Sequence, residues 1–296
     1  MRLSVIVPCY NAEPTIDLQL QALASQSWTE SWEIIIANNG STDRTVELAE
    51  SYREKLPNLR IVDASGKCGA AYAKNCGVGA STGEALLFCD ADDEVAPEWV
   101  SKMGSALLEH DFVASRLEYE KLNTPWTLRS RRKSQKNGLQ SYNHPPYLPH
   151  AAGCSLGIKR SIYDAVGGFD ETLSHLEDTD FCWKVQLSGT KLHLVPDAVV
   201  HYRFRDDLKG IYNQARSYAK ADVLLYKKYQ QFGMPKLSWK AGLIDWLRLL
   251  KRWPNLFNEE TRVRWVRELG WNIGHLEGSL NYRITASSTE LKQGGK

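Results

Sequence analysis

Residues 86–93 are Leu86-Leu87-Phe88-Cys89-Asp90-Ala91-Asp92-Asp93, an apolar run that leads directly into three carboxylates. The run predicts a buried strand, which places the acids at its carboxyl end. Carboxylates crowded at one point repel one another unless a hard cation such as Mg²⁺ or Mn²⁺ neutralises them. The segment therefore predicts a metal site, and a solvated acidic turn or a helix N-cap is the alternative.

Strands alternate with helices on the N-terminal side of this segment. The pattern predicts strands over residues 3–8, 32–37, 59–63 and 85–89, with helices over 13–25, 41–56 and 70–80 between them. Such alternation is typical of βαβ units and an α/β fold with a mostly parallel sheet. Ligands of such sheets bind at the carboxyl ends of the strands, where the polar clusters fall.

The pattern changes on the C-terminal side. Residues 124–149 predict a long basic loop with Arg129, Arg131, Arg132, Lys133 and Lys136, and loops of this length are often functional. Extended segments follow over 151–158, 192–195 and 198–204, with a helix over 181–187. From residue 208 to about 280 the spacing is helical. We therefore expect an α/β domain over residues 1–205 and a helical extension over 206–296.

The composition excludes several classes of protein. The chain has 296 residues, 43% of them hydrophobic, and a net charge of +2, which does not favour a nucleic-acid-binding protein. We expect no export signal and no apolar stretch of the roughly 20 residues that span a bilayer. The six cysteines form no CxxC pair, so we expect reduced thiols and a cytoplasmic protein.

Two further clusters suit chemistry. Glu177 and Asp178 precede an aromatic-rich helical segment, where Asp178 could act as a general base toward an acceptor hydroxyl; ordinary helix-start acids are the alternative. His201, Arg203 and Arg205 alternate along an extended run and would share one face, which suits a diphosphate. The alternative is that His201 is an ordinary surface or core histidine that binds no ligand.

The succession of motifs along the chain is more specific than any one of them. In order they are Val5-Ile6-Val7-Pro8-Cys9-Tyr10-Asn11-Ala12-Glu13, Asn39-Gly40-Ser41-Thr42-Asp43, Ala73-Lys74-Asn75-Cys76-Gly77, the acidic run Asp90-Ala91-Asp92-Asp93, Gly167-Gly168-Phe169-Asp170-Glu171 and Glu177-Asp178. Over residues 1–205 this succession resembles the family 2 inverting glycosyltransferases, which have the GT-A fold. The resemblance implies transfer of a sugar from a nucleotide-sugar donor to a glycan or lipid-linked acceptor.

The resemblance also implies roles for individual residues. It implies a catalytic domain whose first half, residues 1–100, binds the nucleotide, and a second half, 101–205, that faces sugar and acceptor. The nucleotide contacts would be Pro8, Tyr10, Asn11, Glu13, Asn38, Lys74 and Asp90. Asp92 and His201 would bind Mn²⁺ or Mg²⁺, and Asp178 would be the base, with Glu177 beside it. Sugar or phosphate contacts would come from Ala91, Gly153, Gly168, Phe169, Trp183, Arg203 and Arg205.

The chain departs from the family pattern at two places. Asn38-Asn39 stands where the family has Asp-Asp. An asparagine still accepts a hydrogen bond from uracil, so UDP is expected, but its amide also leaves thymine and guanine open. Lys184 stands where arginine is common, and lysine cannot make the bidentate contact of arginine.

An amphipathic helix is predicted over residues 239–253. Its apolar face would carry Trp239, Leu243, Trp246, Leu247, Leu250 and Trp253, opposite Lys240, Arg248, Lys251 and Arg252. We expect this face to pack on the protein. Peripheral contact with the inner face of a membrane is the alternative, because basic helices with apolar tryptophans also bind bilayer interfaces.

Two rival functions remain at this point. A sugar nucleotidyltransferase would carry a glycine-rich phosphate loop after the first strand, where this chain has Tyr10-Asn11-Ala12-Glu13. A catalytically degenerate scaffold or carbohydrate-binding protein would explain Asn38-Asn39, although Asp92 and Asp178 are both present.

Overall fold

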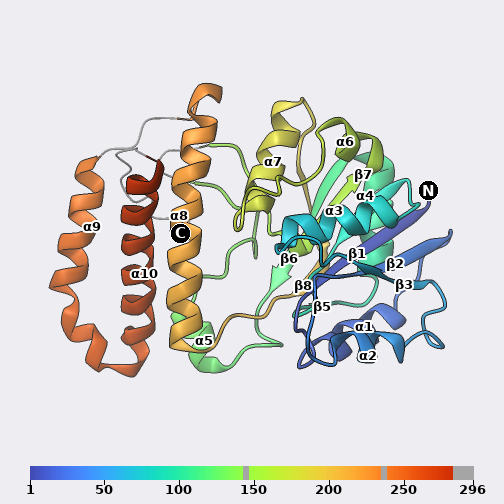
Figure 1. Ribbon diagram of the computed structural model, residues 1–296, viewed down its shortest axis with the longest axis horizontal. Coiled ribbons are helices and arrows are strands. Elements are labelled where there is room, and N and C mark those ends of the chain that lie inside the picture. The colour runs from blue at the N-terminus through green and yellow to red at the C-terminus, as the bar shows by residue number, and fades with distance from the viewer. Residues whose placement is uncertain (143–146, 235–238, 283–296) are drawn as a thin grey trace. The chain divides into compact units, whose positions relative to one another are not determined.

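The described residues divide into two compact units. The structure, a computed structural model, describes residues 1–142, 147–234 and 239–282 (Figure 1). The first unit contains Met1–Leu122, Ser134–Leu139 and His150–Arg203, and the second contains Asn123–Lys133, Gln140–Pro149 and the chain from Phe204 onward.

An eight-stranded mixed sheet forms the centre of the first unit, in the order β3-β2-β1-β4-β7-β6-β8-β5. Its strands are β1 (Leu3–Cys9), β2 (Trp32–Asn38), β3 (Leu59–Asp63), β4 (Ala85–Phe88), β5 (Glu94–Val95), β6 (Phe112–Glu118), β7 (Leu156–Lys159) and β8 (His193–His201). The first four strands of the order pair in parallel, as predicted, and β6 pairs with β8 in parallel. β7 and β5 run antiparallel to their neighbours.

Helices cover both faces of this sheet. They are α1 (Ile16–Ala24), α2 (Thr45–Glu50), α3 (Ala70–Ala80), α4 (Trp99–Glu109), α6 (Arg160–Ala165) and α7 (Glu177–Leu187), with a 3₁₀ turn at Gly153–Ser155. Figure 1 shows α3 on the opposite side of the strands from α1 and α2. Gly77 permits the close approach of α3, because a Cβ there would lie 2.6 Å from Cγ2 of Ile6.

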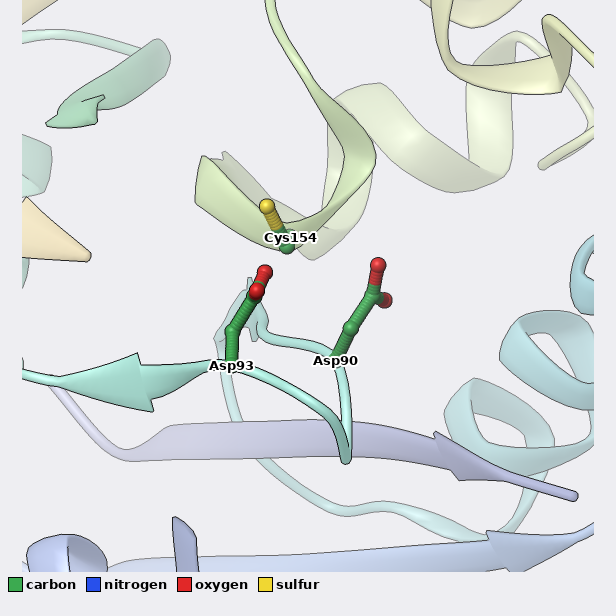
Figure 2. A group of neighbouring side chains, drawn as sticks. All are labelled: Asp90, Asp93 and Cys154. Atoms are coloured by element: carbon green, nitrogen blue, oxygen red, sulfur yellow. The ribbon is translucent and has the colours of Figure 1, made fainter. Parts of the chain in front are cut away.

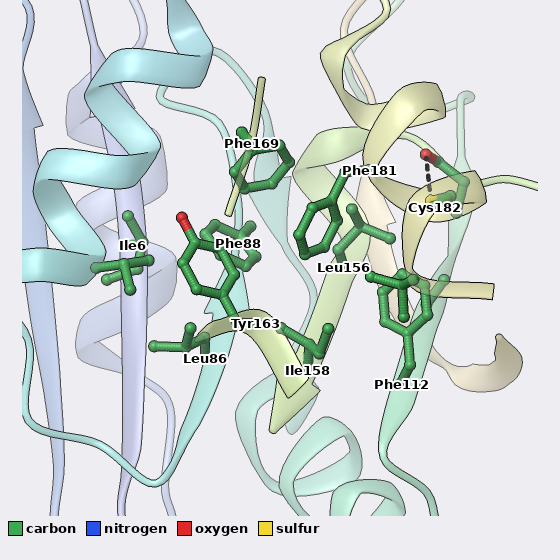
Figure 3. Close-up of a cluster of buried hydrophobic side chains, with 14 of the residues drawn as sticks. Ile6, Leu86, Phe88, Phe112, Leu156, Ile158, Tyr163, Phe169, Phe181 and Cys182 are labelled. Carbon is green, nitrogen blue, oxygen red and sulfur yellow. Dashed lines mark hydrogen bonds between the residues drawn. The ribbon is translucent and has the colours of Figure 1, made fainter. Parts of the chain in front are cut away.

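Aromatic rings fill the core beneath α7. Phe169 stacks on Phe181 at 4.3 Å between ring centroids and meets Phe88 edge-on at 5.2 Å (Figure 3). Phe112 meets Phe181 edge-on at 5.9 Å. Such pairs stabilise a core by about 0.5–1.5 kcal/mol each beyond the area that they bury. This cluster fixes the start of α7, which carries Glu177 and Asp178, against β4 and β7.

The second unit is helical. Its elements are α5 (Pro125–Ser130), α8 (Leu208–Tyr229), α9 (Trp239–Lys251) and α10 (Glu259–Tyr282), with 3₁₀ turns η2 (Gln230–Phe232) and η3 (Trp253–Phe257). Asp207 caps α8 by accepting a hydrogen bond from the N–H of Gly210 at 2.7 Å. Within this unit α10 packs along α8, and α5 and α9 also contact α10.

A row of glycines sets the separation of α8 and α10. Gly270, Gly274 and Gly278 recur every four residues on α10, so they share one helix face. A Cβ at Gly274 would lie 2.1 Å from the carbonyl oxygen of Arg216, and one at Gly270 would lie 2.5 Å from that of Tyr212. The row therefore lets the two backbones approach more closely than side chains would permit.

Several sequence expectations need correction. The segment predicted as a strand over 198–204 stays in the sheet only to His201, and the strand predicted over 151–158 begins at Leu156. The segment 124–149 is not a continuous loop: it contains α5, its residues 134–139 belong to the first unit, and residues 143–146 lie outside the described part. The chain changes unit between Arg203 and Phe204, and residues 123–133 and 140–149 also belong to the second unit. The sequence pattern did not predict β6.

The apolar face expected to pack on the protein is instead largely exposed. Leu243, Leu247 and Leu250 of α9 are 55%, 50% and 62% exposed, whereas Leu249 is the buried leucine of this helix. Packing of the predicted face is therefore wrong for these residues, because α9 turns the Leu249 side inward. The side chains of Trp239 and Lys240 lie outside those described. None of the described helices is long and apolar enough to cross a membrane.

Candidate active site

The loops after β1 and β2 are joined by side-chain hydrogen bonds. Asn11 accepts from the N–H of Thr42 at 2.8 Å, and its own N–H donates to the Ser41 hydroxyl at 3.0 Å. The Glu13 carboxylate accepts from the N–H of Arg44 at 3.1 Å. These contacts hold the predicted nucleotide residues of β1 and β2 at one edge of the sheet, with Tyr10 exposed beside them. Arg44 stands at the N-cap of α2, so this helix begins later than the predicted residue 41.

The asparagine pair has a structural explanation at its second position. The Asn39 amide donates to the carbonyl oxygens of Ala64 at 2.5 Å and Lys67 at 2.8 Å, while its oxygen accepts from the N–H of Gly69 at 2.9 Å. An aspartate could not donate the first two bonds. Asn38 accepts from the N–H of Ser41 at 3.0 Å.

The acidic run forms a tight turn after β4. Figure 2 shows the Asp93 carboxyl directed toward the sulfur of Cys154, with the Asp90 carboxylate alongside. One ligand atom from each of these three residues lies within 4.8 Å of the other two. Burial, and then the charges of Asp92 and Asp90, raise the pKa of Asp93 well above its ordinary value. Burial likewise raises the pKa of the Cys154 thiol.

Arg203 and His201 lie against this turn. The N–H of Arg203 donates to Oδ1 of Asp93 at 2.8 Å, and its Nε donates to the carbonyl oxygen of Asp92 at 2.9 Å. Nδ1 of His201 lies 2.5 Å from Oε2 of Glu118. A carboxylate on one imidazole nitrogen is the arrangement found behind many metal-binding histidines, because it orients the other nitrogen.

A buried lysine links the acidic turn to α7. Lys74 is 2% exposed, and its Nζ lies 3.0 Å from Oε1 of Glu177. Burial opposes the charged form of Lys74, but the charges of Glu177, Asp90 and Asp178 outweigh it and raise the pKa. Breaking a buried ion pair by removing one partner costs about 3–5 kcal/mol. The buried Lys74 ammonium therefore interacts with these carboxylates and makes little contact with solvent.

Hydrogen bonds and neighbouring charges set the pKa of the Asp178 carboxyl. Its Oδ2 accepts from the N–H of Gly153 at 2.9 Å, and its Oδ1 accepts from the N–H of Thr179 at 2.7 Å. Burial and the charge of Glu177 raise the pKa of Asp178 to about 6, while Lys74 and the two N–H groups oppose the rise. The carboxylate is therefore mostly ionised at neutral pH yet more basic than an ordinary aspartate.

Gly153 is required where Lys74 and Asp178 meet. A Cβ at this position would lie 2.6 Å from Nζ of Lys74 and 3.4 Å from Cβ of Asp178. Burial, against the charge of Lys74, also raises the pKa of Asp90 to about 6. Lys74, Asp90, Glu177 and Asp178 thus form one electrostatically linked cluster, which we call the Lys74 cluster.

The carboxylates fit a hard divalent cation. Oδ2 of Asp93 is buried and accepts no hydrogen bond from any described residue, and carboxylates with one imidazole suit Mn²⁺ or Mg²⁺. Burial raises the pKa of the Cys154 thiol, and Mn²⁺ and Mg²⁺ prefer oxygen to sulfur ligands. The convergent group of Asp90, Asp93 and Cys154 differs from the predicted ligands Asp92 and His201, whose assignment stays a prediction.

Two of the predicted sugar contacts are buried, and their assignment stays a prediction. Phe169 is 2% exposed within the aromatic core and Trp183 is fully buried, so both rings pack in the core. Both lie on hydrophobic faces that pack inward. Gly168, at φ +65°, shapes the turn before Phe169, where a Cβ would lie 2.8 Å from the Tyr163 hydroxyl oxygen. Arg205 lies beyond the end of β8, in the second unit, so it does not share a strand face with His201.

Sequence reasoning missed several residues of this region. Glu118, Asp93 and Cys154 gave no signal as a group, because they are far apart in the sequence. Asn75 was only part of a motif, yet its amide donates to the Phe169 carbonyl at 2.9 Å and to Glu171 at 2.8 Å. Its oxygen accepts from the N–H of Phe169 at 3.0 Å. Asn75 thereby organises the Gly167–Phe169 turn.

Comparison with known proteins gives consistent results. The model of glycosyl transferase family 2 matches residues 4–167, and that of glycosyl transferase family group 2 matches residues 87–276. The uncharacterised glycosyltransferase YibD of Escherichia coli is 39% identical over 43% of this chain, and the Staphylococcus aureus poly(ribitol-phosphate) β-N-acetylglucosaminyltransferase TarS is 27% identical over 68%. The matched region spans 35% of the length of each of these two relatives.

Solved structures share the fold. A Pyrobaculum calidifontis mannosyltransferase in complex with GDP-mannose and Mn²⁺ superposes with a TM-score of 0.62 at 19% identity, covering 98% of this chain and 77% of the other. A TarS fragment in complex with UDP gives 0.55 at 20% identity, covering 96% and 92%. The family match covers more than half of the chain. The chain therefore belongs to glycosyl transferase family 2 and has the GT-A fold.

Proposed function

We propose that this protein is an inverting, metal-dependent glycosyltransferase that moves a sugar from a nucleotide-diphosphate donor, UDP-linked in the first instance, to a glycan or lipid-linked acceptor. The observation that carries the proposal is the Lys74 cluster, with Asp178 as the general base. A base whose pKa lies near the working pH is the most effective in proton transfer, and the pKa of Asp178 is raised to about 6.

The residues have distinct parts in this proposal. Pro8, Tyr10, Glu13, Asn38 and Asp90 would border the nucleoside. Asp92 and His201 would hold the divalent cation, which supplies charge stabilisation for the departing diphosphate. Asp178 would accept the proton of the acceptor hydroxyl as that oxygen attacks the anomeric carbon in line with the leaving group. Glu177 would keep Asp178 basic, and Lys74 would keep Glu177 ionised.

The relatives support the donor class. TarS is named for transfer of N-acetylglucosamine to poly(ribitol phosphate) and has been solved with UDP-GlcNAc, and the Pyrobaculum calidifontis mannosyltransferase has been solved with GDP-mannose. We infer a nucleotide-sugar donor for this chain as well. The Asn38-Asn39 pair does not favour a degenerate scaffold, because the Asn39 amide serves the turn itself.

Inversion is tested by the stereochemistry of donor cleavage. In the absence of acceptor, Asp178 is expected to activate water for slow hydrolysis of UDP-GlcNAc or GDP-mannose in the presence of Mn²⁺. Proton NMR recorded before mutarotation should show the free sugar first in the anomeric configuration opposite to that of the donor. A first product with the donor's own configuration would rule out a single displacement.

Peripheral membrane contact is the second part of the proposal. Trp253 and Phe257 of η3, which follows α9 in the chain, are 59% and 70% exposed. Arg248 and Lys251 of α9 are exposed as well. Apolar side chains beside exposed cations fit the surface of an anionic bilayer, which takes up both.

Vesicle sedimentation tests this contact. The protein should pellet with vesicles that contain phosphatidylglycerol, and the double variant Leu247→Glu, Leu250→Glu should stay in the supernatant. Leu108→Glu places the same charge on α4 at a leucine that is 61% exposed and should pellet like the unmodified protein. Equal pelleting of the double variant, or no pelleting of the unmodified protein, would exclude the contact.

A further inference from the structure

The strand pairing of β8 sets the position of His201. In the sheet β8 lies between β6 and β5, and His201 is paired with Glu118 of β6 on one side and with Glu94 of β5 on the other. Glu94 follows Asp92 by two residues, so this register brings the end of β8 against the acidic turn. All of these residues belong to the first unit. The pairing therefore fixes the histidine beside Asp92 without any contribution from the second unit.

The two glutamates beside His201 have different partners. Oε2 of Glu118 lies 2.5 Å from Nδ1 of His201, and the side chains of the two residues are only 18% and 16% exposed. The Glu118 carboxylate also accepts from the N–H of Lys121 at 3.3 Å and from the N–H of Glu120, so the chain after β6 holds it in place. Glu94 instead pairs with Nζ of Lys121 at 2.5 Å. Of the two glutamates, Glu118 is therefore the one that acts on the imidazole.

The contact determines which nitrogen of His201 carries the proton. An ionised carboxylate accepts hydrogen bonds and donates none, so the proton of the neutral imidazole lies on Nδ1, facing Glu118. The lone pair is then on Nε2, which becomes the nitrogen available to a cation. A neutral imidazole without such a partner can adopt either tautomer, and its ring can rotate. A carboxylate that removes both freedoms prepares a histidine to bind a metal.

We propose that Glu118 is a positioning residue for the metal site, which fixes the tautomer and the orientation of His201 so that Nε2 can bind the cation. The cation clause rests on the proposed function, which makes His201 a metal ligand. The contact between the two side chains does not depend on it. An oriented imidazole also favours Mn²⁺ over Mg²⁺, because Mg²⁺ prefers oxygen ligands. Glu118 thus contributes both to the affinity of the site and to its selectivity.

The response to Mn²⁺ measures this contribution. A ligand that binds only the folded state raises the melting temperature, and the Mn²⁺ concentration that gives half of the rise is determined at a fixed concentration of UDP. Removing a residue that holds a metal ligand typically weakens metal binding about 10- to 100-fold, so Glu118→Ala should raise this concentration by such a factor. Glu118→Gln should raise it less, because the glutamine oxygen can still accept from Nδ1–H of His201. The corresponding Mg²⁺ concentration should change much less.

A double-mutant cycle separates positioning from a general structural role. In the His201→Ala background, Glu118→Ala should have no further effect on the Mn²⁺ response, because Glu118 acts through the imidazole. Glu94→Gln makes the matched change on the other side of His201, at a glutamate that pairs with Lys121, and should respond like the unmodified protein. Three results would overturn the proposal: an unchanged response in Glu118→Ala, an effect of Glu118→Ala that persists without His201, or no response in the unmodified protein.

The tautomer of His201 gives a readout that needs neither metal nor nucleotide. Nitrogen-15 NMR of the imidazoles above neutral pH, with the His201 signals assigned by their loss in His201→Ala, should show a protonated Nδ1 and an unprotonated Nε2. Glu118→Ala should show the other tautomer or a mixture, and an identical spectrum in both proteins would refute the orienting role. Mn²⁺ binding that depends on Glu118 and His201, without any cleavage of UDP-GlcNAc or GDP-mannose, would instead overturn the glycosyltransferase proposal and leave the positioning role standing.

Discussion

Asp178→Asn should lower kcat by about a thousandfold, within the range of 10² to 10⁴ that a positioned general base contributes. The asparagine has the same shape, and its oxygen can still accept from the N–H of Gly153, which lies 2.9 Å from Oδ2 of Asp178. It cannot take a proton at neutral pH. Initial rates of nucleoside-diphosphate release from UDP-GlcNAc and GDP-mannose, at saturating donor, measure the loss.

The control makes the same chemical change elsewhere. Asp197 is exposed on β8, so Asp197→Asn should keep the unmodified rate. Asp178→Asn should also keep the rise in melting temperature that the nucleotide causes, since Asp178 acts on the acceptor and not on the nucleotide. More than one tenth of the original kcat in Asp178→Asn would exclude the residue as the base.

The pH dependence of the same rate gives an independent readout. The pKa of Asp178 is raised to about 6, so the carboxyl is protonated and inactive below that pH and ionised above it. The value of kcat/KM should therefore fall about tenfold per pH unit below pH 6 and level off above it. Because Asp90 has a similar pKa and is linked to the same cluster, the midpoint belongs to the cluster as a whole.

The strand ends and their polar residues could be predicted from sequence. Period and composition located β1 to β4, and parallel strands bring their carboxyl ends to one edge, so the acidic run and Asn38 fall at the site. The resemblance to glycosyl transferase family 2 and the GT-A fold were confirmed. The spacing of residues along the sequence therefore predicts which residue types lie near the end of a strand.

Pairings between distant residues could not be predicted. Lys74 and Glu177 are 103 positions apart, and His201 and Glu118 are 83 apart. No local pattern encodes such contacts, since they depend on how β6, β8, α3 and α7 pack. The expectation that Lys74 borders the nucleotide did not include its burial against Glu177.

Side-chain direction was the other limit. The aromatic residues near Gly168 and Asp178 suited a sugar pocket by type, yet Phe169 and Trp183 turn into the core. The helix was predicted correctly at α9, but the face predicted to pack is exposed at Leu243, Leu247 and Leu250. The helical period defines two faces without indicating which one meets a neighbouring helix.

Asp92→Ala should abolish the stabilisation that a nucleotide gives in the presence of Mn²⁺. The change removes one carboxylate and leaves the turn intact, because Arg203 anchors it through the backbone oxygen of Asp92 and the side chain of Asp93. Removing a residue that only hydrogen-bonds to a metal ligand typically weakens metal binding about 10- to 100-fold. Removing a ligand itself should therefore weaken Mn²⁺ binding by about a hundredfold or more. Asp111→Ala removes an exposed carboxylate that pairs with Lys159 and should respond normally.

The melting temperature of the purified protein with UDP, GDP, CDP or dTDP, each with and without Mn²⁺, tests the central claim most directly. The account predicts that UDP raises the melting temperature only when Mn²⁺ is present, and that Asp92→Ala loses this rise while Asp111→Ala keeps it. Stabilisation by none of the four nucleotides with Mn²⁺, or an undiminished rise in Asp92→Ala, would contradict it.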